Sequence, residues 1–410
     1  MSTVVELPVR SGAAAPPTGG PVAIASRLDS VDLLRGIVMI LMALDHTRDY
    51  VGNAATNPTN LATTTVALFL TRWITHFCAP TFSLLTGVGA FLMLRRKTKR
   101  EVSWFLLTRG IWLIVLEATV SRFLWQFNVD YHVTYLIVLW ALGWSMIVLS
   151  VLVFLPTSAI ATISIATIAL HNLFDGMQAP ATTAGRLVWF ILHRPGPLYA
   201  RDGMMWFLGY PLIPWVAIMS LGFAIGVVFT WPAERRRGFL MRAGLACVAG
   251  FFVLRILNVY GDPLRWSPQK SSAFTLLSFM NVTKTPPSLL FVLMTVGAAL
   301  LVLRASDAST PRILRPAVTI GRVPMFYYIA HVALLHLLVT AEALIRYGSA
   351  AIVTRSPTLD RFPFTQPPGW PASLPFVYAA WVLVVVLLYP CCRWYARYKT
   401  EHDYAWLSYL

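Results

Sequence analysis

The sequence predicts an all-α, polytopic integral membrane protein with about ten transmembrane helices. The amino-acid composition supports this prediction, because 57% of the 410 residues are apolar and only 12% are charged. In an ordinary soluble chain about a quarter of the residues are charged. The mean hydropathy is +0.65. At about 20 residues per spanning helix, the apolar residues suffice for roughly ten spans. A disordered chain, a collagen-like chain and a disulfide scaffold are excluded.

Windows of about 19 residues locate the expected spans. The ten candidate spans are 31–50, 67–94, 103–125, 134–155, 157–173, 207–230, 239–259, 286–304, 317–344 and 372–396. Residues 1–25 contain Pro16, Pro17 and Pro21 and no apolar run, so they are expected to form a flexible tail that leaves 26–410 as one transmembrane domain. The four cysteines lie in apolar stretches, and we interpret them as packing residues.

The distribution of charge sets the expected orientation. The basic loops Arg95–Arg100 and Glu234–Arg237 fall on the same side when the spans are counted, and the positive-inside rule assigns that side and both termini to the cytoplasm. Of the 33 Lys and Arg residues, 20 then lie inside and 13 outside. The net charge of +16 is thus first a topology signal of a plasma (inner) membrane protein, and no nucleic-acid partner is expected.

Three long loops are expected on the outer side, at about 174–206, 260–285 and 345–371. They are rich in Pro, Gly and Trp, which predicts an ordered outer cap instead of slack linkers.

Ionisable side chains inside the spans mark the candidate functional region, because burying each of them in a membrane is costly. We expect His46, Arg72, Arg122, His336 and Glu342 towards the outer face, His76, Glu117 and His331 deeper in the membrane, and Arg35, Arg109 and Arg322 in the inner half. An alternative interpretation is that His76, His331 and His336 only form hydrogen bonds between helices. Glu117 and Arg122 could likewise neutralise each other across about one helical turn.

The first span combines a basic inner end with a potential general base at its outer end. Arg35 and His46 are eleven residues apart, which corresponds to about 16 Å along a straight helix. That distance fits an extended substrate with an anionic head in the cytoplasm and a reactive tip near the outer leaflet. Asp45 points about 100° away from His46, so any histidine that it orients is expected on another helix unless the helix unwinds here.

The second span contains Pro80, Gly87 and Gly89, which predict a kink. The kink is compatible either with close helix packing or with a substrate groove.

Several motifs resemble a known family. The run Ser26–Gly36 and the helix that ends in Leu44–His46 resemble the heparan-alpha-glucosaminide N-acetyltransferase-like family, and three further runs are similar to its bacterial members: Asn281–Leu289, Gly321–His331 and Trp406–Leu410. The likeness extends from about residue 27 to the end. The resemblance implies transfer of an acetyl group from cytoplasmic acetyl-CoA to a sugar or glycolipid on the far side of the membrane.

The spacing of Arg35 and His46 is also similar to the motif of the broader transmembrane acyltransferase families, in which both residues serve the acyl-CoA reaction. In the animal members of the first family, the key histidine lies in the outer loop after the first span. The corresponding loop here, Gly52–Thr65, contains no histidine. His46 is therefore assigned from the wider motif.

These observations assign expected roles. The expected catalytic residues are His46, Asp45 and Glu117, with His46 as general base or, alternatively, as acyl carrier. The residues expected to bind acetyl-CoA are Arg35, Arg95, Arg96, Lys97 and Arg322, although charged loops are also typical topology signals. The residues expected to bind the acceptor are Arg72, His76, Arg122, His331 and His336. No metal ion is expected.

The outer loops also offer aromatic and polar residues suited to a sugar ring, which are Arg194, Tyr199, Arg201, Asp202, Asp262, Trp266 and Trp370. Interfacial Trp and Tyr are equally typical of membrane anchors.

A rival interpretation of the whole chain is a proton-coupled transporter or lipid-sugar flippase that uses the same His and Glu residues. That class predicts paired broken helices, and the sequence shows one clear break, near Pro80. A third interpretation, a structural partner of other membrane proteins, would leave the ionisable residues inside the spans unexplained.

Overall fold

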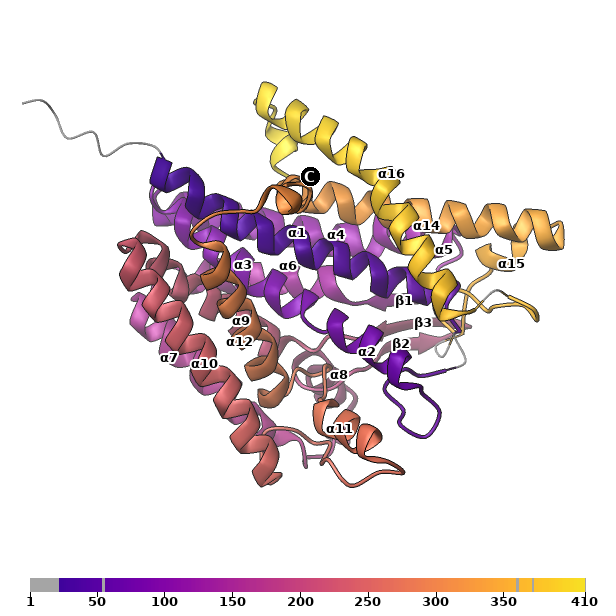
Figure 1. Ribbon diagram of the computed structural model, residues 1–410. Helices are drawn as coiled ribbons and strands as arrows, with labels where there is room; N and C mark the ends of the chain where they lie inside the picture. Colours follow the sequence, from indigo (N-terminus) through magenta and orange to yellow (C-terminus); the bar gives the residue numbers. More distant parts are fainter. Residues whose placement is uncertain (1–21, 54–55, 359–360, 371, 410) are drawn as a thin grey trace, which may run out of the picture.

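The computed structural model describes residues 22–53, 56–358, 361–370 and 372–409. Most of the predicted tail, residues 1–21, lies outside the described residues, whereas residues 22–25 belong to the first helix. The described chain is a bundle of helices with one small sheet at one end (Figure 1). The predicted class, an all-α polytopic membrane protein, is confirmed.

Ten helical segments correspond to the ten predicted spans. They are α1 (Val22–Val51), α2 (Val66–Thr75) with α3 (Cys78–Met93), α4 (Lys99–Leu116) continued by η1 (Glu117–Ser121) and α5 (Arg122–Gln126), α6 (Val138–Leu152), α7 (Thr157–Leu170) with η2 (His171–Phe174), α9 (Leu212–Ile225) with η3 (Gly226–Thr230), α10 (Ala233–Leu257), α12 (Leu289–Ser306), α14 (Pro324–Tyr347) and α16 (Leu374–Glu401). Within the described residues, 8 of these segments are long and apolar enough to cross a membrane. Of the other two, α6 is shorter, and α1 carries six acidic and basic residues between Asp29 and Asp49.

The three long loops contain regular structure, as the prediction of ordered loops requires, and their place on the outer side stays a prediction. The short elements of the chain are α8 (Thr183–Leu192), α11 (Ser272–Met280), η4 (Arg312–Leu314), α13 (Arg315–Gly321), α15 (Ala351–Thr354), η5 (Ala405–Ser408), β1 (Val133–Leu136), β2 (Gly196–Arg201) and β3 (Met204–Leu208). In the sheet, β3 lies between β1, to which it is parallel, and β2, to which it is antiparallel. The hairpin between β2 and β3 turns at Asp202-Gly203, both with positive φ, as this dipeptide favours.

Hydropathy placed two span boundaries inside the sheet. The predicted span 134–155 begins in β1, and the predicted span 207–230 begins at the end of β3. Both strands consist of apolar, aromatic and β-branched residues, which a hydropathy window does not distinguish from the start of a helix. The spanning helices α6 and α9 therefore begin a few residues later than expected.

Proline breaks two of the predicted spans. Pro80 cannot donate a hydrogen bond to the carbonyl of His76, and the regular helix is interrupted between α2 and α3 at His76 and Phe77, although both residues keep right-handed helical φ and ψ angles. The second span is thus interrupted close to Pro80, and the kink itself stays a prediction. The ninth span is interrupted in the same way, because α13 ends at Gly321 and α14 begins at Pro324.

Helix α1 lies in the middle of the bundle, where α16 crosses over it and α3, α13 and α14 pack against it (Figure 1). Glycines permit the closest crossings. At the crossing of α3 and α9, a Cβ atom on Gly87 would overlap the carbonyl oxygen of Met219, and one on Gly222 would overlap that of Leu84. The two backbones are therefore in direct contact, as small residues allow between membrane helices.

Substituting Gly87→Ala is expected to destabilise the protein by about 1–3 kcal/mol, because the added methyl group must push α9 away from α3. The matched control is Gly89→Ala in the same helix, where an added Cβ meets nothing within 4 Å. That control is expected to be neutral or stabilising, since alanine favours a helix over glycine. Thermal unfolding in detergent measures both, and equal melting temperatures for the two variants would contradict the prediction.

Candidate functional site

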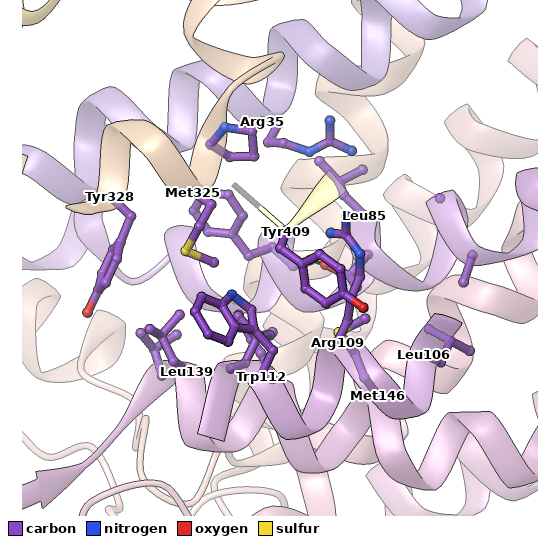
Figure 2. Close-up of a pocket in the computed structure, with 18 of the residues that line it drawn as sticks. Arg35, Leu85, Leu106, Arg109, Trp112, Leu139, Met146, Met325, Tyr328 and Tyr409 are labelled. Carbon is purple, nitrogen blue, oxygen red and sulfur yellow. Dashed lines mark hydrogen bonds between the residues drawn. The ribbon is translucent and has the colours of Figure 1, made fainter. Parts of the chain in front are cut away.

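One cavity, of about 470 Å³, lies between α1, α3, α4, α6 and α14. We call it the basic cavity, because its charged lining residues are Arg35, Arg109, Arg322 and Lys399. The remaining lining is mostly apolar, with Thr86, Tyr328 and Tyr409 as polar exceptions. Figure 2 shows Arg35, Arg109 and Tyr409 on one side of this cavity and Tyr328 on the other. A mostly apolar space whose lining includes four cations suits a ligand that has an anionic head and an uncharged arm.

The arginines of the basic cavity differ in their partners. Arg35 donates to Asp32 at 2.7 Å and to the Gly321 carbonyl at 3.2 Å, and Arg322 pairs with Asp29 at 2.9 Å. Arg109 instead lies over the rings of Phe105 and Tyr409, with its guanidinium carbon 4.4 and 5.2 Å from their centroids.

Among the described residues no carboxylate lies within ion-pair distance of Arg109. Its positive charge is therefore available to a ligand.

The predicted donor-binding residues Arg95, Arg96 and Lys97 lie in the exposed loop between α3 and α4 and are not part of the cavity lining. The ammonium of Lys97 lies 5.6 Å from the ring centroid of Phe105, which does line the basic cavity. The loop thus lies next to the cavity, and a role in binding acetyl-CoA stays a prediction.

A second cavity, of about 530 Å³, surrounds the other end of α1. We call it the histidine cavity. Its ionisable lining residues are Asp45, His46, Arg48, Asp49, Arg72, His76 and Lys284. Its walls also include Trp125, Tyr210, the loop after α1 and residues 281–285. Because so many of its lining residues are ionisable or polar, this cavity is far more polar than the basic cavity.

Residues of the two cavity linings are in direct contact. Tyr328 lines the basic cavity, and His46 and Trp125 line the histidine cavity. The indole N–H of Trp125 donates to the Tyr328 hydroxyl at 3.4 Å, and the His46 ring centroid lies 6.1 Å from that of Tyr328. A group at the Tyr328 end of the basic cavity is therefore adjacent to His46.

Hydrogen bonds fix the protonation pattern of His46. The Nδ1 atom of His331 lies 2.8 Å from the carbonyl oxygen of Tyr327, which only accepts, so Nδ1 of a neutral His331 carries the proton. Nε2 of His331 is then an acceptor for Nδ1–H of His46, at 2.7 Å. The lone pair of His46 is left on Nε2, and among the described residues no hydrogen bond to this atom is present. His46 is thus arranged as a base.

Asp45 faces away from His46, as the helical geometry of α1 requires. Its carboxylate accepts from Arg72 at 2.8 Å and from the Thr75 hydroxyl at 2.9 Å, and it pairs with Arg48 at 2.9 Å. These contacts hold α1 against α2. A catalytic role for Asp45 stays a prediction, and its contacts are those of a residue that positions two arginines.

Glu117 and Arg122 have separate partners. Glu117 lies in the π-helical turn η1 and accepts from the backbone N–H groups of Leu139 and Trp140, at the start of α6, at 2.8 and 3.3 Å. Arg122 donates to the carbonyl of Asn128 and pairs with Asp130. The alternative that they neutralise each other therefore does not describe their contacts, and a catalytic role for Glu117 stays a prediction.

The remaining predicted acceptor-binding residues divide into two groups. His76 and Arg72 line the histidine cavity, and Nδ1 of His76 has no hydrogen-bond partner in the described part of the chain. His336 lies within 3.0–3.1 Å of the carbonyls of Leu124 and Val353, as expected of a histidine that links helices. Arg122 and His336 both lie outside the cavity lining, and their role in acceptor binding stays a prediction.

Sequence reasoning did not assign Arg109, Lys284 or Tyr328 to the site. Arg109 was visible as a charge inside a span, and Lys284 lies in the run Asn281–Leu289 that carries the family resemblance. Conversely, the seven loop residues proposed to hold a sugar ring do not line the histidine cavity. Within the described residues no group of three or more His, Cys, Asp or Glu side chains could hold a metal ion.

Comparison with models of protein families matches residues 27–260 to the family described as heparan-alpha-glucosaminide N-acetyltransferase, catalytic. The matched segment is more than half of the 410 residues. It contains Arg35, His46 and Arg109, and it ends before Lys284 and His331. A search of curated proteins found no match.

Proposed function

The chain belongs to the heparan-alpha-glucosaminide N-acetyltransferase family, a family of membrane acetyltransferases, and from this premise we propose that it carries an acetyl group across the membrane. In this proposal acetyl-CoA binds from the cytoplasmic side in the basic cavity. The acceptor, a sugar or glycolipid, enters the histidine cavity from the opposite side. Both termini are cytoplasmic in this orientation, as the positive-inside rule indicates.

The observation that supports this proposal is the succession of two cavities along α1, one lined by residues from Arg35 to Met42 and the other by residues from Asp45 to Asp49, with contacts between their linings at Trp125, His46 and Tyr328. Arg35 and His46 lie on one continuous helix, so their separation along its axis is about 16 Å. The phosphates of CoA would lie near the arginines, and the thioester would reach the Tyr328 end. CoA need never leave its side of the membrane.

In the reaction, Nε2 of His46 removes the proton from the acceptor hydroxyl or amine as that group attacks the thioester carbonyl. The new bond to the carbonyl carbon forms, the carbon–sulfur bond breaks, and the CoA thiolate leaves with the bonding electron pair. The proton on His46 returns to the thiolate, which leaves as free CoA. His331 holds His46 in the reactive tautomer throughout and stabilises the imidazolium through their hydrogen bond.

The test uses purified protein in sealed vesicles, with acetyl-CoA supplied only on the side of the loop Arg95–Arg100. A tag at the amino terminus, accessible to protease on one side only, reports the orientation of each preparation. We expect free CoA thiol on the side of supply and acetylated product on the opposite side, with added cell-envelope glycolipids as acceptors.

Two outcomes would contradict the proposal. If acetyl-CoA produced no thermal stabilisation of the purified protein and no thiol release, the enzyme interpretation would be wrong. If acetylated product appeared only on the side of supply, the protein would be an acetyltransferase that does not act across the membrane. Movement of an unmodified sugar without thiol release would favour the transporter interpretation.

A further inference from the structure

Lys284 lies in the wall of the histidine cavity, and within the described part of the chain no carboxylate pairs with it. It is half-buried and lines this cavity together with His46 and His76. Its ammonium lies 5.5 Å from the ring centroid of Tyr210, another lining residue. Among the described residues, no acidic side chain lies within 4 Å of this ammonium.

The other charges of the cavity are already paired. Asp45 binds Arg72 and Arg48, and Asp49 accepts from Arg48 at 2.6 Å. With neutral histidines, the lining therefore contains three cations and two anions, and the excess positive charge is that of Lys284. A cation in a cavity of this kind attracts anionic ligands more strongly than it would in open water.

Buried polar contacts hold the backbone both before and after Lys284 in the sequence. Asp262 accepts from the backbone N–H of Thr283 at 2.8 Å and from the Ser288 hydroxyl at 2.6 Å. Arg255 donates to the carbonyl of Asn281 at 2.7 Å. Burial raises the pKa of Asp262, and the hydrogen bonds from Ser288, Thr283 and Leu264 oppose that effect.

A carboxylate and a guanidinium thus fix the backbone around Lys284. A charged group held by such a framework binds its partner at a lower entropic cost than a lysine on a free loop.

We propose that the acceptor carries an anionic group, a carboxylate or a phosphate, and that Lys284 binds this group while the reacting hydroxyl or amine lies at His46. This inference rests on the proposed function, because it places the acceptor in the histidine cavity. It adds the chemical class of the acceptor: an acidic sugar or a sugar phosphate, not a neutral sugar.

Binding of three related probes to the purified protein tests the inference: glucose, glucuronate and glucose 1-phosphate. The variants are Lys284→Gln, which removes the charge, and Lys284→Arg, which keeps it. The matched control is Lys270→Gln, which removes an exposed lysine of the same outer loop that does not line the cavity. Calorimetric titration at constant ionic strength gives each dissociation constant, and thermal stabilisation by acetyl-CoA is recorded for every variant.

We expect wild type, Lys270→Gln and Lys284→Arg to bind one of the anionic probes about tenfold to a hundredfold more tightly than glucose. Lys284→Gln should lose this preference. A preference for glucuronate identifies the anion as a carboxylate, and a preference for glucose 1-phosphate identifies it as a phosphate.

The inference is overturned if wild type binds neither anionic probe more tightly than glucose, or if Lys284→Gln keeps the preference. Either result with intact stabilisation by acetyl-CoA leaves the proposed acetyltransferase function in place. If acetyl-CoA does not stabilise the wild-type protein against thermal unfolding, that result instead counts against the proposed function itself.

Discussion

Replacing His46 with alanine is expected to lower the rate of acetyl transfer by a factor of about 10² to 10⁴, the usual contribution of a general base. The physical reason is the loss of the lone pair on Nε2 of His46, which is available to accept a proton because Nδ1 of the same ring is hydrogen-bonded to His331. Steady-state transfer in vesicles supplied with acetyl-CoA measures the effect. Thermal stabilisation by acetyl-CoA should persist in His46→Ala, because His46 does not line the basic cavity.

The matched control is His132→Ala, since His132 is an exposed histidine near the same end of the bundle and lies outside both cavity linings. Wild-type rates in His46→Ala would end the assignment of this residue as the base. Incubation of wild type with labelled acetyl-CoA in the absence of acceptor separates the two chemical roles. An acetylated protein that disappears in His46→Ala identifies an acyl carrier, and its absence identifies a base.

Replacing Arg109 with glutamine is expected to raise KM for acetyl-CoA by about tenfold to a hundredfold, which is the size of one charge-assisted contact. Arg109 is the arginine of the basic cavity that lacks a carboxylate partner among the described residues, so the whole of its charge is available to CoA. The turnover number should change little, because the phosphates are bound equally in the ground state and the transition state.

Arg235→Gln is the control, because this exposed arginine stacks on Trp231 at 4.3 Å and lies outside the cavity. An unchanged KM in Arg109→Gln, with transfer intact, would contradict the placement of CoA in the basic cavity. Arg35→Gln should have a smaller effect, since Asp32 already neutralises part of its charge.

The sequence predicted the class of fold and several residues that line the cavities, because a charge inside an apolar helix is conspicuous. These are Arg35 and Arg322 in the basic cavity and Asp45, His46, Arg72 and His76 in the histidine cavity. The same signal also selected Arg122 and His336, which bind backbone carbonyls in the loops. An ionisable group in a span needs a partner, but the sequence does not say whether that partner is a substrate or the protein backbone.

The sequence contained no comparable signal that Lys284 belongs to the site. A lysine in a polar loop is ordinary, and its place beside His46 depends on contacts made by Asp262 and Arg255, which are set by the path of the loop and not by helical periodicity. The sheet was missed for a similar reason, because apolar strands and apolar helices have the same hydropathy. Pairing between distant segments, such as His46 with His331, is a property of tertiary packing.

The glycine contacts between helices have a consequence for the size of the acyl group. The walls of the basic cavity include α3 and α4, and α3 is spaced from α9 by backbone contact at Gly87 and Gly222. Gly110 and Gly143 space α4 from α6 in the same way. Shortening a lining side chain such as Met42 or Leu139 would therefore enlarge the cavity without letting the walls close. If the acyl group binds in this cavity as proposed, single substitutions of this kind are expected to shift selectivity from acetyl to longer acyl chains.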